Sequence, residues 1–138
     1  YPPRQVRHEV LDPGDFTGRY PSLAIVTPTF NQGQFIERTI RSVMDQAYPA
    51  LNYAIYDGVS KDDTKSVIER LAKEYDFRWK SEPDAGQADA INKAFGMVDG
   101  EIMAWLNSDD LLMPRALLYV GSFFDQNPDI DVIYGHRL

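Results

Sequence analysis

The strongest constraint on the fold is an alternation of two hydrophobic patterns along residues 23–135. Short runs rich in β-branched residues, such as LAIVTPTF at 23–30, are typical of buried strands. The segments between these runs carry apolar residues at helical spacing. The predicted strands are 23–30, 52–58, 77–82, 101–107 and 131–135, and the predicted helices lie at about 33–46, 60–75, 88–98 and from Pro114 onward. Alternating strands and helices predict an α/β fold, with a mostly parallel sheet flanked by helices.

The chain divides into an arm and one domain. Residues 1–22 contain several prolines and glycines and show little periodicity, which predicts an irregular N-terminal arm. Residues 23–138 then form the domain, and a chain of 138 residues suits one hydrophobic core. At the start of the second predicted helix, Ser60 and Asp63 have the spacing of a capping box.

Composition excludes several classes of function. The formal net charge of −7 argues against nonspecific nucleic-acid binding, which needs a basic surface. The chain has no cysteine and only two histidines, so disulfides, thiolate zinc sites and multi-histidine metal sites are not expected. No apolar run has the length of a membrane span, and no signal peptide is recognisable at the start. A cytoplasmic location is therefore expected.

Polar and acidic residues follow each of the first four predicted strands. They are Thr27, Pro28, Thr29, Phe30 and Asn31; then Asp57, Gly58, Ser60, Asp62 and Asp63; then Asp84, Ala85, Gly86 and Gln87; and finally Asn107, Ser108, Asp109 and Asp110. The carboxyl ends of parallel strands lie at one edge of the sheet, where ligands bind. Three acidic clusters are therefore expected to converge on one crevice. Carboxylates that repel one another in this way are stabilised by a hard divalent ion such as Mg²⁺ or Mn²⁺.

Each cluster taken alone also has a purely structural interpretation. Asp62 and Asp63 fit the first turn of a helix, where the dipole favours acids. Asp57 and Asp84 both fit turn chemistry, and Asp109 or Asp110 fits a helix cap. The large aromatic residues Phe30 and Trp105 are interpreted as core residues rather than as platforms for a ligand. It is the occurrence of the clusters at successive strand ends that favours a binding site.

Residues 22–135 resemble the nucleotide-binding half of family 2 glycosyltransferases, the inverting enzymes of the GT-A fold. The resemblance rests on four segments in order: SLAIVTPTFNQGQFIERTIRSVMDQAYP, NYAIYDGVSKDDT, SEPDAGQADAINKAF and GEIMAWLNSDDLLMPRAL. It implies a GT-A domain that binds a nucleoside-diphosphate sugar, most typically a UDP-sugar. The implied reaction is transfer of the sugar to a hydroxyl group of a glycan or lipid-linked acceptor in polysaccharide synthesis.

The resemblance also implies roles for individual residues. The donor nucleotide is expected to contact residues of all four strand ends: Thr27, Pro28, Thr29, Asn31, Asp57, Asp84, Gly86, Gln87, Asn107 and Asp109. Within this set, Asp57 matches the acid that binds the base. The NSDD segment occupies the place of the family's Asp-x-Asp motif, which holds the divalent ion, Mg²⁺ or Mn²⁺, on the donor diphosphate.

Two departures from the family pattern bear on these roles. Asn107 stands where many members have an acid, so the metal role falls on Asp109 and Asp110, and spacing alone does not choose between them. Val59 replaces a frequent glycine in the loop after Asp57.

The family's catalytic base lies in the acceptor-binding half, and no acid after Asp110 is placed like it, so the base is expected beyond Leu138. We therefore expect the chain to be the donor-binding part of a longer glycosyltransferase, truncated so that the acceptor half is absent. The longer parent protein could then also act at the periphery of a membrane. The alternative is that the isolated chain binds nucleotides without catalysis. In either case, self-association through the truncated face is expected.

Two other classes fit less well. A receiver domain would need an acidic pair after the first strand, where this chain has TPTFN. A dinucleotide-binding oxidoreductase would need a G-x-G-x-x-G segment at the same place, and none is present.

Overall fold

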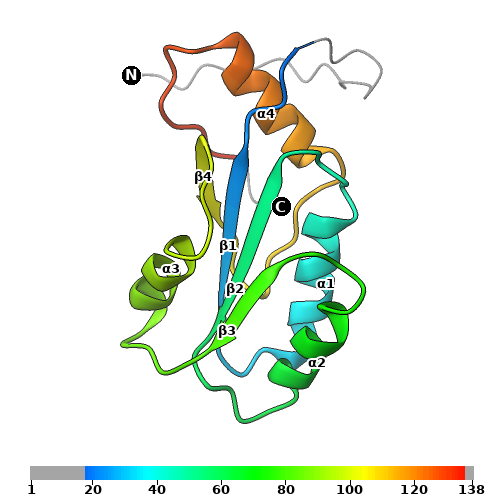
Figure 1. Cartoon of the computed structure of the whole chain (residues 1–138), viewed down its shortest axis with the longest axis vertical. Coiled ribbons are helices and arrows are strands. Elements are labelled where there is room, and N and C mark those ends of the chain that lie inside the picture. Colours follow the sequence, from blue (N-terminus) through cyan, green and yellow to red (C-terminus); the bar gives the residue numbers. More distant parts are fainter. Residues whose placement is uncertain (1–17, 136–138) are drawn as a thin grey trace.

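The computed structural model describes residues 18–135, which form a four-stranded parallel sheet with helices on both faces (Figure 1). The strands are β1 (Leu23–Thr29), β2 (Leu51–Asp57), β3 (Arg78–Ser81) and β4 (Ile102–Trp105). The helices are α1 (Gly33–Met44), α2 (Thr64–Leu71), α3 (Gln87–Phe95) and α4 (Ala116–Gln126). The predicted alternation and the parallel sheet are confirmed.

The strand order is β3-β2-β1-β4, so the chain moves outward from β1 to β3 and then returns to the other side of β1. All seven residues of β1 are buried, because this strand has a neighbour on each side and helices on each face. The direction of winding reverses between β1 and β4. Crevices for ligands form outside the carboxyl ends of the strands at such a switch point.

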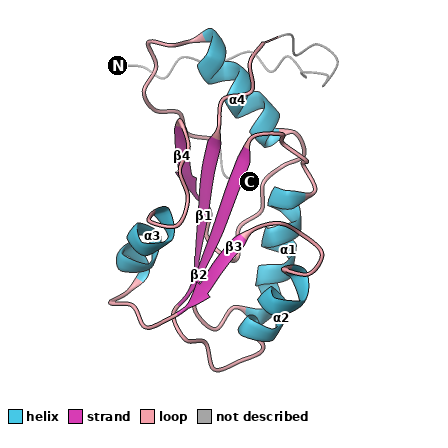
Figure 2. Cartoon of the chain, in the orientation of Figure 1, coloured by secondary structure: helices cyan, strands magenta, loops and turns pink. Residues whose placement is uncertain are grey.

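Helices lie on both faces of the sheet, as Figure 2 shows, and each face carries one hydrophobic cluster. On one face, Ile25 and Ile55 pack against α1, α2 and Leu117 of α4. On the other face, Val26 and Tyr56 pack against α3. The helix predicted at about 88–98 begins at Gln87; its residue Ala88 is exposed, while Ala90 and Ala94 face the sheet. These two small residues, four apart, let α3 lie directly on β1 and β2.

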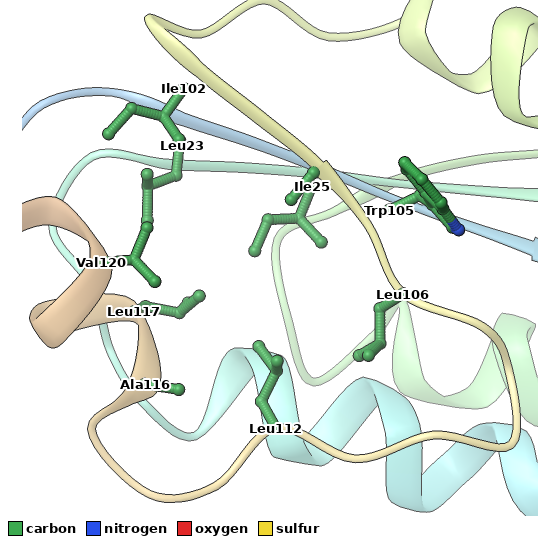
Figure 3. A pocket seen from close by; sticks show the side chains of 10 residues that line it. Leu23, Ile25, Ile102, Trp105, Leu106, Leu112, Ala116, Leu117 and Val120 are labelled. Carbon is green, nitrogen blue, oxygen red and sulfur yellow. The ribbon is translucent and has the colours of Figure 1, made fainter. Parts of the chain in front are cut away.

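The helix α4 covers the β4 side of the sheet incompletely. An apolar cavity of about 90 Å³ lies between β1, β4 and α4 (Figure 3). The helix begins at Ala116, two residues later than the start predicted at Pro114, and it is preceded by Arg115 with φ of 66°. Within residues 18–135, no helix combines the length and the apolar character that crossing a membrane requires.

The fifth strand predicted at 131–135 is wrong, because these residues form no strand. Val132 and Tyr134 are 78% and 83% exposed, so the alternating apolar side chains face solvent instead of a core. A strand also needs a neighbour for its backbone hydrogen bonds, and β4 is paired only with β1 in the described part of the chain. Of the predicted arm, residues 18–22 are irregular, and residues 1–17 lie outside the described residues.

Candidate functional site

The carboxylate of Asp57 is fully buried at the carboxyl end of β2. It accepts hydrogen bonds from the Ser81 hydroxyl at 2.6 Å, from the Ser60 backbone N–H at 3.2 Å, and from the Ser60 hydroxyl. Ser81 is the register partner of Asp57 on β3, which explains how the two side chains meet. Asp57 therefore ties the end of β2 to the end of β3 and to the loop that follows β2.

The loops after β1 and β2 are joined by four further hydrogen bonds. The backbone N–H groups of Asn31, Gln32 and Gly33 donate to Ser60 Oγ, Thr64 Oγ1 and Asp62 Oδ2 at 2.8, 2.8 and 3.0 Å. The side-chain oxygen of Asn31 in turn accepts from the Lys61 N–H at 2.7 Å. These bonds give both loops a fixed shape, in which the backbone N–H groups at the start of α1 are satisfied by side chains of the second loop and of the first residue of α2.

Two residues in these loops have left-handed backbone conformations, Asn31 with φ of 52° and Val59 with φ of 63°. Asparagine tolerates this region, whereas a β-branched residue there is a strained exception. Val59 thus takes a conformation that glycine adopts freely. The bonds from Ser60 to Asp57 hold the loop in this shape.

The capping box predicted from Ser60 and Asp63 is wrong. Helix α2 begins at Thr64, its N-cap Asp63 makes no side-chain cap hydrogen bond, and Ser60 bonds to Asp57 instead. Asp62 and Asp63 precede the helix rather than lying in its first turn. Asp62 accepts from the hydroxyl and N–H of Thr64 and from the Gly33 N–H, and these bonds lower the pKa of the Asp62 carboxyl.

The turn after β3 is organised by two acids. Asp84 Oδ1 accepts the Gly86 N–H at 2.8 Å, and Asp89 Oδ2 accepts the Ala85 N–H at 2.9 Å. Gly86 has φ of 115°, a conformation that L side chains rarely adopt. A Cβ placed on Gly58 would lie 2.5 Å from Asp84 Oδ2, so this turn lies directly against the loop after β2.

The acidic loop after β4 is connected to both α3 and α1. The Gln87 side-chain amide donates to Asn107 Oδ1 at 2.7 Å, and the Asn107 amide donates to Asp110 Oδ2 at 3.1 Å. The Thr39 hydroxyl on α1 contacts the carbonyl oxygens of Ser108 and Asp110 at 2.8 and 3.0 Å. Between them, the exposed carboxylate of Asp109 has no hydrogen bond or ion pair with any described residue.

The structure brings most of the predicted site residues together. Asn31, Asp57, Asp84, Gly86, Gln87, Asn107 and Asp109 lie at or just beyond the carboxyl ends of the four strands. By contrast, the side chains of Thr27, Pro28 and Thr29 are buried within β1. Thr27 shares a 2.8 Å hydrogen bond with Tyr53, while the buried Thr29 hydroxyl has no hydrogen-bond partner among the described residues.

The interpretation of Phe30 and Trp105 as core residues is wrong, because their side chains are 56% and 60% exposed. Phe30 lies one residue past the end of β1, beyond the cover of the helices, and its ring is 3.5 Å from the Cβ position of Gly58. Trp105 ends β4, which is the edge strand of the described sheet. Both aromatic rings are therefore available to a ligand.

The acids at this edge do not form a ready-made metal cage. Between residues 18 and 135, no three side chains of His, Cys, Asp or Glu lie close enough together to hold a metal ion. Asp57 is instead buried among serine hydroxyl groups. Sequence reasoning missed the roles of Ser60, Ser81 and Phe30. The position of Ser81 beside Asp57 at the end of the next strand was the one available signal.

Comparison with known proteins agrees with this geometry. The family model described as "Glycosyl transferase family 2" matches residues 24–138. A Campylobacter jejuni protein named GalNAc(5)-diNAcBac-PP-undecaprenol beta-1,3-glucosyltransferase is 32% identical over 104 residues, which cover 70% of this chain and 32% of that protein. The putative teichuronic acid biosynthesis glycosyltransferase TuaG of Bacillus subtilis is 36% identical over 93 residues, which cover 65% of this chain and 36% of TuaG. The chain thus spans about a third of the length of these relatives.

Two solved structures show the same fold. The mannosyltransferase PcManGT from Pyrobaculum calidifontis, in complex with GDP-Man and Mn²⁺, matches with a TM-score of 0.71 and 26% identity over 77% of this chain and 33% of that one. S. aureus TarS 1-349, in complex with UDP-GlcNAc, matches with a TM-score of 0.72 and 21% identity over 78% of this chain and 32% of that one. The fold is that of the GT-A glycosyltransferases. With a family model that matches all four strands from Ala24 onward, the chain belongs to glycosyltransferase family 2.

Proposed function

We propose that this chain is the donor-binding part of an inverting glycosyltransferase, and that it binds a nucleoside-diphosphate sugar at the carboxyl edge of the sheet. The observation that carries the proposal is that contacts link the four segments at the carboxyl ends of the strands. Asn31 after β1 bonds to Ser60 after β2, and Gly58 after β2 lies against Asp84 after β3. Gln87, which follows the Asp84 turn, bonds to Asn107 after β4. A site made from four chain segments at a switch point is typical of ligand binding in open α/β sheets. The complexes of PcManGT with GDP-Man and of TarS with UDP-GlcNAc support the same ligand class.

The residues of the acidic loop fit a divalent ion that is shared with the donor. Mg²⁺ in phosphate sites is typically bound by one or two carboxylates, with phosphate and water oxygens as the remaining ligands. The exposed carboxylate of Asp109 and its neighbour Asp110 offer such a donor set, although no group of three acids is present among residues 18–135. A bound Mg²⁺ or Mn²⁺ would offset the charge that develops on the departing nucleoside diphosphate.

We propose that the nucleotide lies across the loops after β1, β2 and β3. Phe30 offers an exposed aromatic face for the base, next to Gly58 in the loop after β2. The Asp57 carboxylate is buried and already accepts bonds from two serines, so its contribution to base binding includes holding the loop of Ser60 and Lys61 in shape. We propose a UDP-sugar as the donor.

We propose that, in a glycosyltransferase of the relatives' full length, a hydroxyl of a glycan or lipid-linked acceptor would attack the anomeric carbon from the face opposite the leaving group. The relatives include a putative teichuronic acid biosynthesis enzyme and a Staphylococcus epidermidis poly-beta-1,6-N-acetyl-D-glucosamine synthase, which supports a role in glycan assembly.

One observation favours a second candidate, in which the isolated chain binds the donor without transferring the sugar. Asp125, the first acid after Asp110, lies 3.8 Å from Arg19, which pairs with Glu101 just before β4. This places Asp125 at the amino end of the sheet, opposite the proposed site, so it does not act as the base there.

A thermal-shift screen of UDP, GDP and their sugars with and without Mn²⁺ tests the proposal. We expect a nucleoside diphosphate to raise the melting temperature, and Mn²⁺ to enlarge the shift, because a ligand that binds only the folded state stabilises it. If no nucleotide shifts the transition, the proposal is wrong. Release of free sugar or its transfer by the isolated chain would reject the second candidate.

A further inference from the structure

We propose that Asn107 is a positioning residue that holds Asp110 as an anchor and leaves Asp109 as the carboxylate that meets the ion. This inference rests on the proposed function, and it assigns to Asn107 a role other than direct contact with the donor. It starts from a chain of two hydrogen bonds, from Gln87 to Asn107 at 2.7 Å and from Asn107 to Asp110 at 3.1 Å.

The chemistry of Asp110 fixes which group donates in each of these two hydrogen bonds. An ionised carboxylate only accepts hydrogen bonds, so Asn107 must present its amide nitrogen to Asp110 and its oxygen to Gln87. If the side-chain amide of Gln87 were turned around, its oxygen would face Asn107 Oδ1, and if that of Asn107 were turned around, its oxygen would face Asp110 Oδ2. The three side chains therefore define one another's orientation, which an isolated asparagine on a loop would not achieve.

The backbone holds Asp110 in the same place. Its N–H donates to the Asn107 carbonyl at 3.1 Å, and its carbonyl oxygen accepts from the Thr39 hydroxyl at 3.0 Å. The side chain and the main chain of Asp110 are thus both engaged, and the residue is half-buried. Asp109 is exposed and has no such contact among the described residues, so its two oxygens are open to a cation.

An amide at position 107 suits this arrangement better than an acid. Asparagine donates a charge-assisted hydrogen bond to Asp110 without adding charge. An aspartate there would have no donor, and it would place a second carboxylate beside Asp110, where like charges disfavour ionisation. The departure from the family's usual acid therefore fits a loop with a single anchored carboxylate and a single open one.

The arrangement also couples two parts of the site. Gln87 is the first residue of α3 and directly follows the turn that Asp84 and Gly86 form. Through Asn107, the start of this helix is tied to the acidic loop, so that the turn and the ion site keep a fixed separation.

The test is a double-mutant cycle of Asn107→Ala and Asp110→Ala, with calorimetric titration of UDP in the presence and absence of Mn²⁺. Electron paramagnetic resonance of Mn²⁺ measures retention of the ion separately. For Asn107→Ala we expect metal-free UDP affinity to stay within about twofold and the gain in affinity from Mn²⁺ to fall about tenfold, because Asp110 then no longer anchors the loop that carries Asp109, and losing an outer contact of a metal site typically costs about that much. In the Asp110→Ala background, Asn107→Ala should add less than about a twofold change, because the two residues act as one unit.

Asn92→Ala is the matched control, since Asn92 is exposed on α3 and its side chain makes no hydrogen bond with the described residues. If Asn107→Ala fails to fold, Asn107→Ser replaces it, because the shorter side chain cannot reach both partners. Loss of metal-free UDP affinity in the single variant, an unchanged Mn²⁺ gain, or fully additive losses would each overturn the inference. A wild-type chain that binds no nucleotide would reject the proposed function together with this inference, whereas normal wild-type binding with an unaffected Asn107→Ala would reject the inference alone.

Discussion

The Ser81 hydroxyl at the end of β3 donates a 2.6 Å hydrogen bond to the buried carboxylate of Asp57 at the end of β2. This bond joins two neighbouring strands at the point where the sheet meets the proposed donor site. Since Asp57 also holds Ser60, one carboxylate stabilises both the sheet edge and the loop beyond it.

Asp57→Ala should lower the free energy of unfolding by about 2 kcal/mol, because it leaves buried serine donors without an acceptor. Ser81→Ala should cost about 1 kcal/mol, since the carboxylate keeps its bonds from Ser60. Urea denaturation measures both values, and Asp99→Ala, a change at an exposed acid before β4, is the control. Equal stability of Asp57→Ala and wild type would show that this carboxylate does not hold the edge together.

Gly58→Ala should weaken UDP binding about tenfold with little change in stability. The new Cβ would lie 2.5 Å from Asp84 Oδ2. The Asp84 side chain can rotate away at a small cost in stability, but it would then be misplaced for contact with the nucleotide. Gly135→Ala is the control, because a Cβ at Gly135 meets no atom within 4 Å. Calorimetric titration decides the matter, and full UDP affinity in Gly58→Ala would contradict the placement of Asp84 in the site.

Phe30→Leu should weaken UDP binding by about fivefold to tenfold, since leucine keeps the bulk but not the aromatic face that stacks on a base. The Phe35→Leu variant is the control, because Phe35 is also partly exposed, at 38%, but lies on α1. Equal losses in both variants, or none in Phe30→Leu, would speak against a stacking role for Phe30.

The contribution of Asp62 to stability should disappear in acid. Its pKa is lowered by the Thr64 hydroxyl and then by the Gly33 N–H, so the folded state favours the ionised form. A depressed pKa gives stabilisation that is present above the ordinary aspartate value near about 4 and is lost as the pH falls through the lower folded value. The difference in melting temperature between wild type and Asp62→Asn should therefore be largest near neutral pH and shrink below about pH 4. A difference that grows in acid would contradict this assignment.

The sequence predicted the elements that depend on local periodicity and missed those that depend on what surrounds them. The apolar runs around Ile25 and Ile55 predicted buried parallel strands, and the topology then required their polar ends to meet. The same pattern at 131–135 predicted a strand that does not form, because β-pattern residues also need a free neighbouring strand.

Sequence patterns could not predict which side chains bond to one another in the site. Ser60 has the spacing of a helix cap, but its hydroxyl donates to the buried carboxylate of Asp57 instead. The link from Gln87 to Asn107 joins residues 20 positions apart, and only the fold brings them together. Phe30 looks like a core residue by composition, yet it lies just past the end of the covered strand.

The most direct test of the account is calorimetric titration of UDP into wild type, Asp109→Asn and the control Asp99→Asn, each with and without Mn²⁺. Both variants remove one negative charge from an exposed residue, but Asp99 precedes β4, at the opposite end of the strand from the acidic loop. We expect Mn²⁺ to tighten UDP binding in wild type and in Asp99→Asn, and to have no effect in Asp109→Asn. Equal Mn²⁺ dependence in all three proteins would contradict the central claim that the loop after β4 holds the ion on a nucleoside diphosphate.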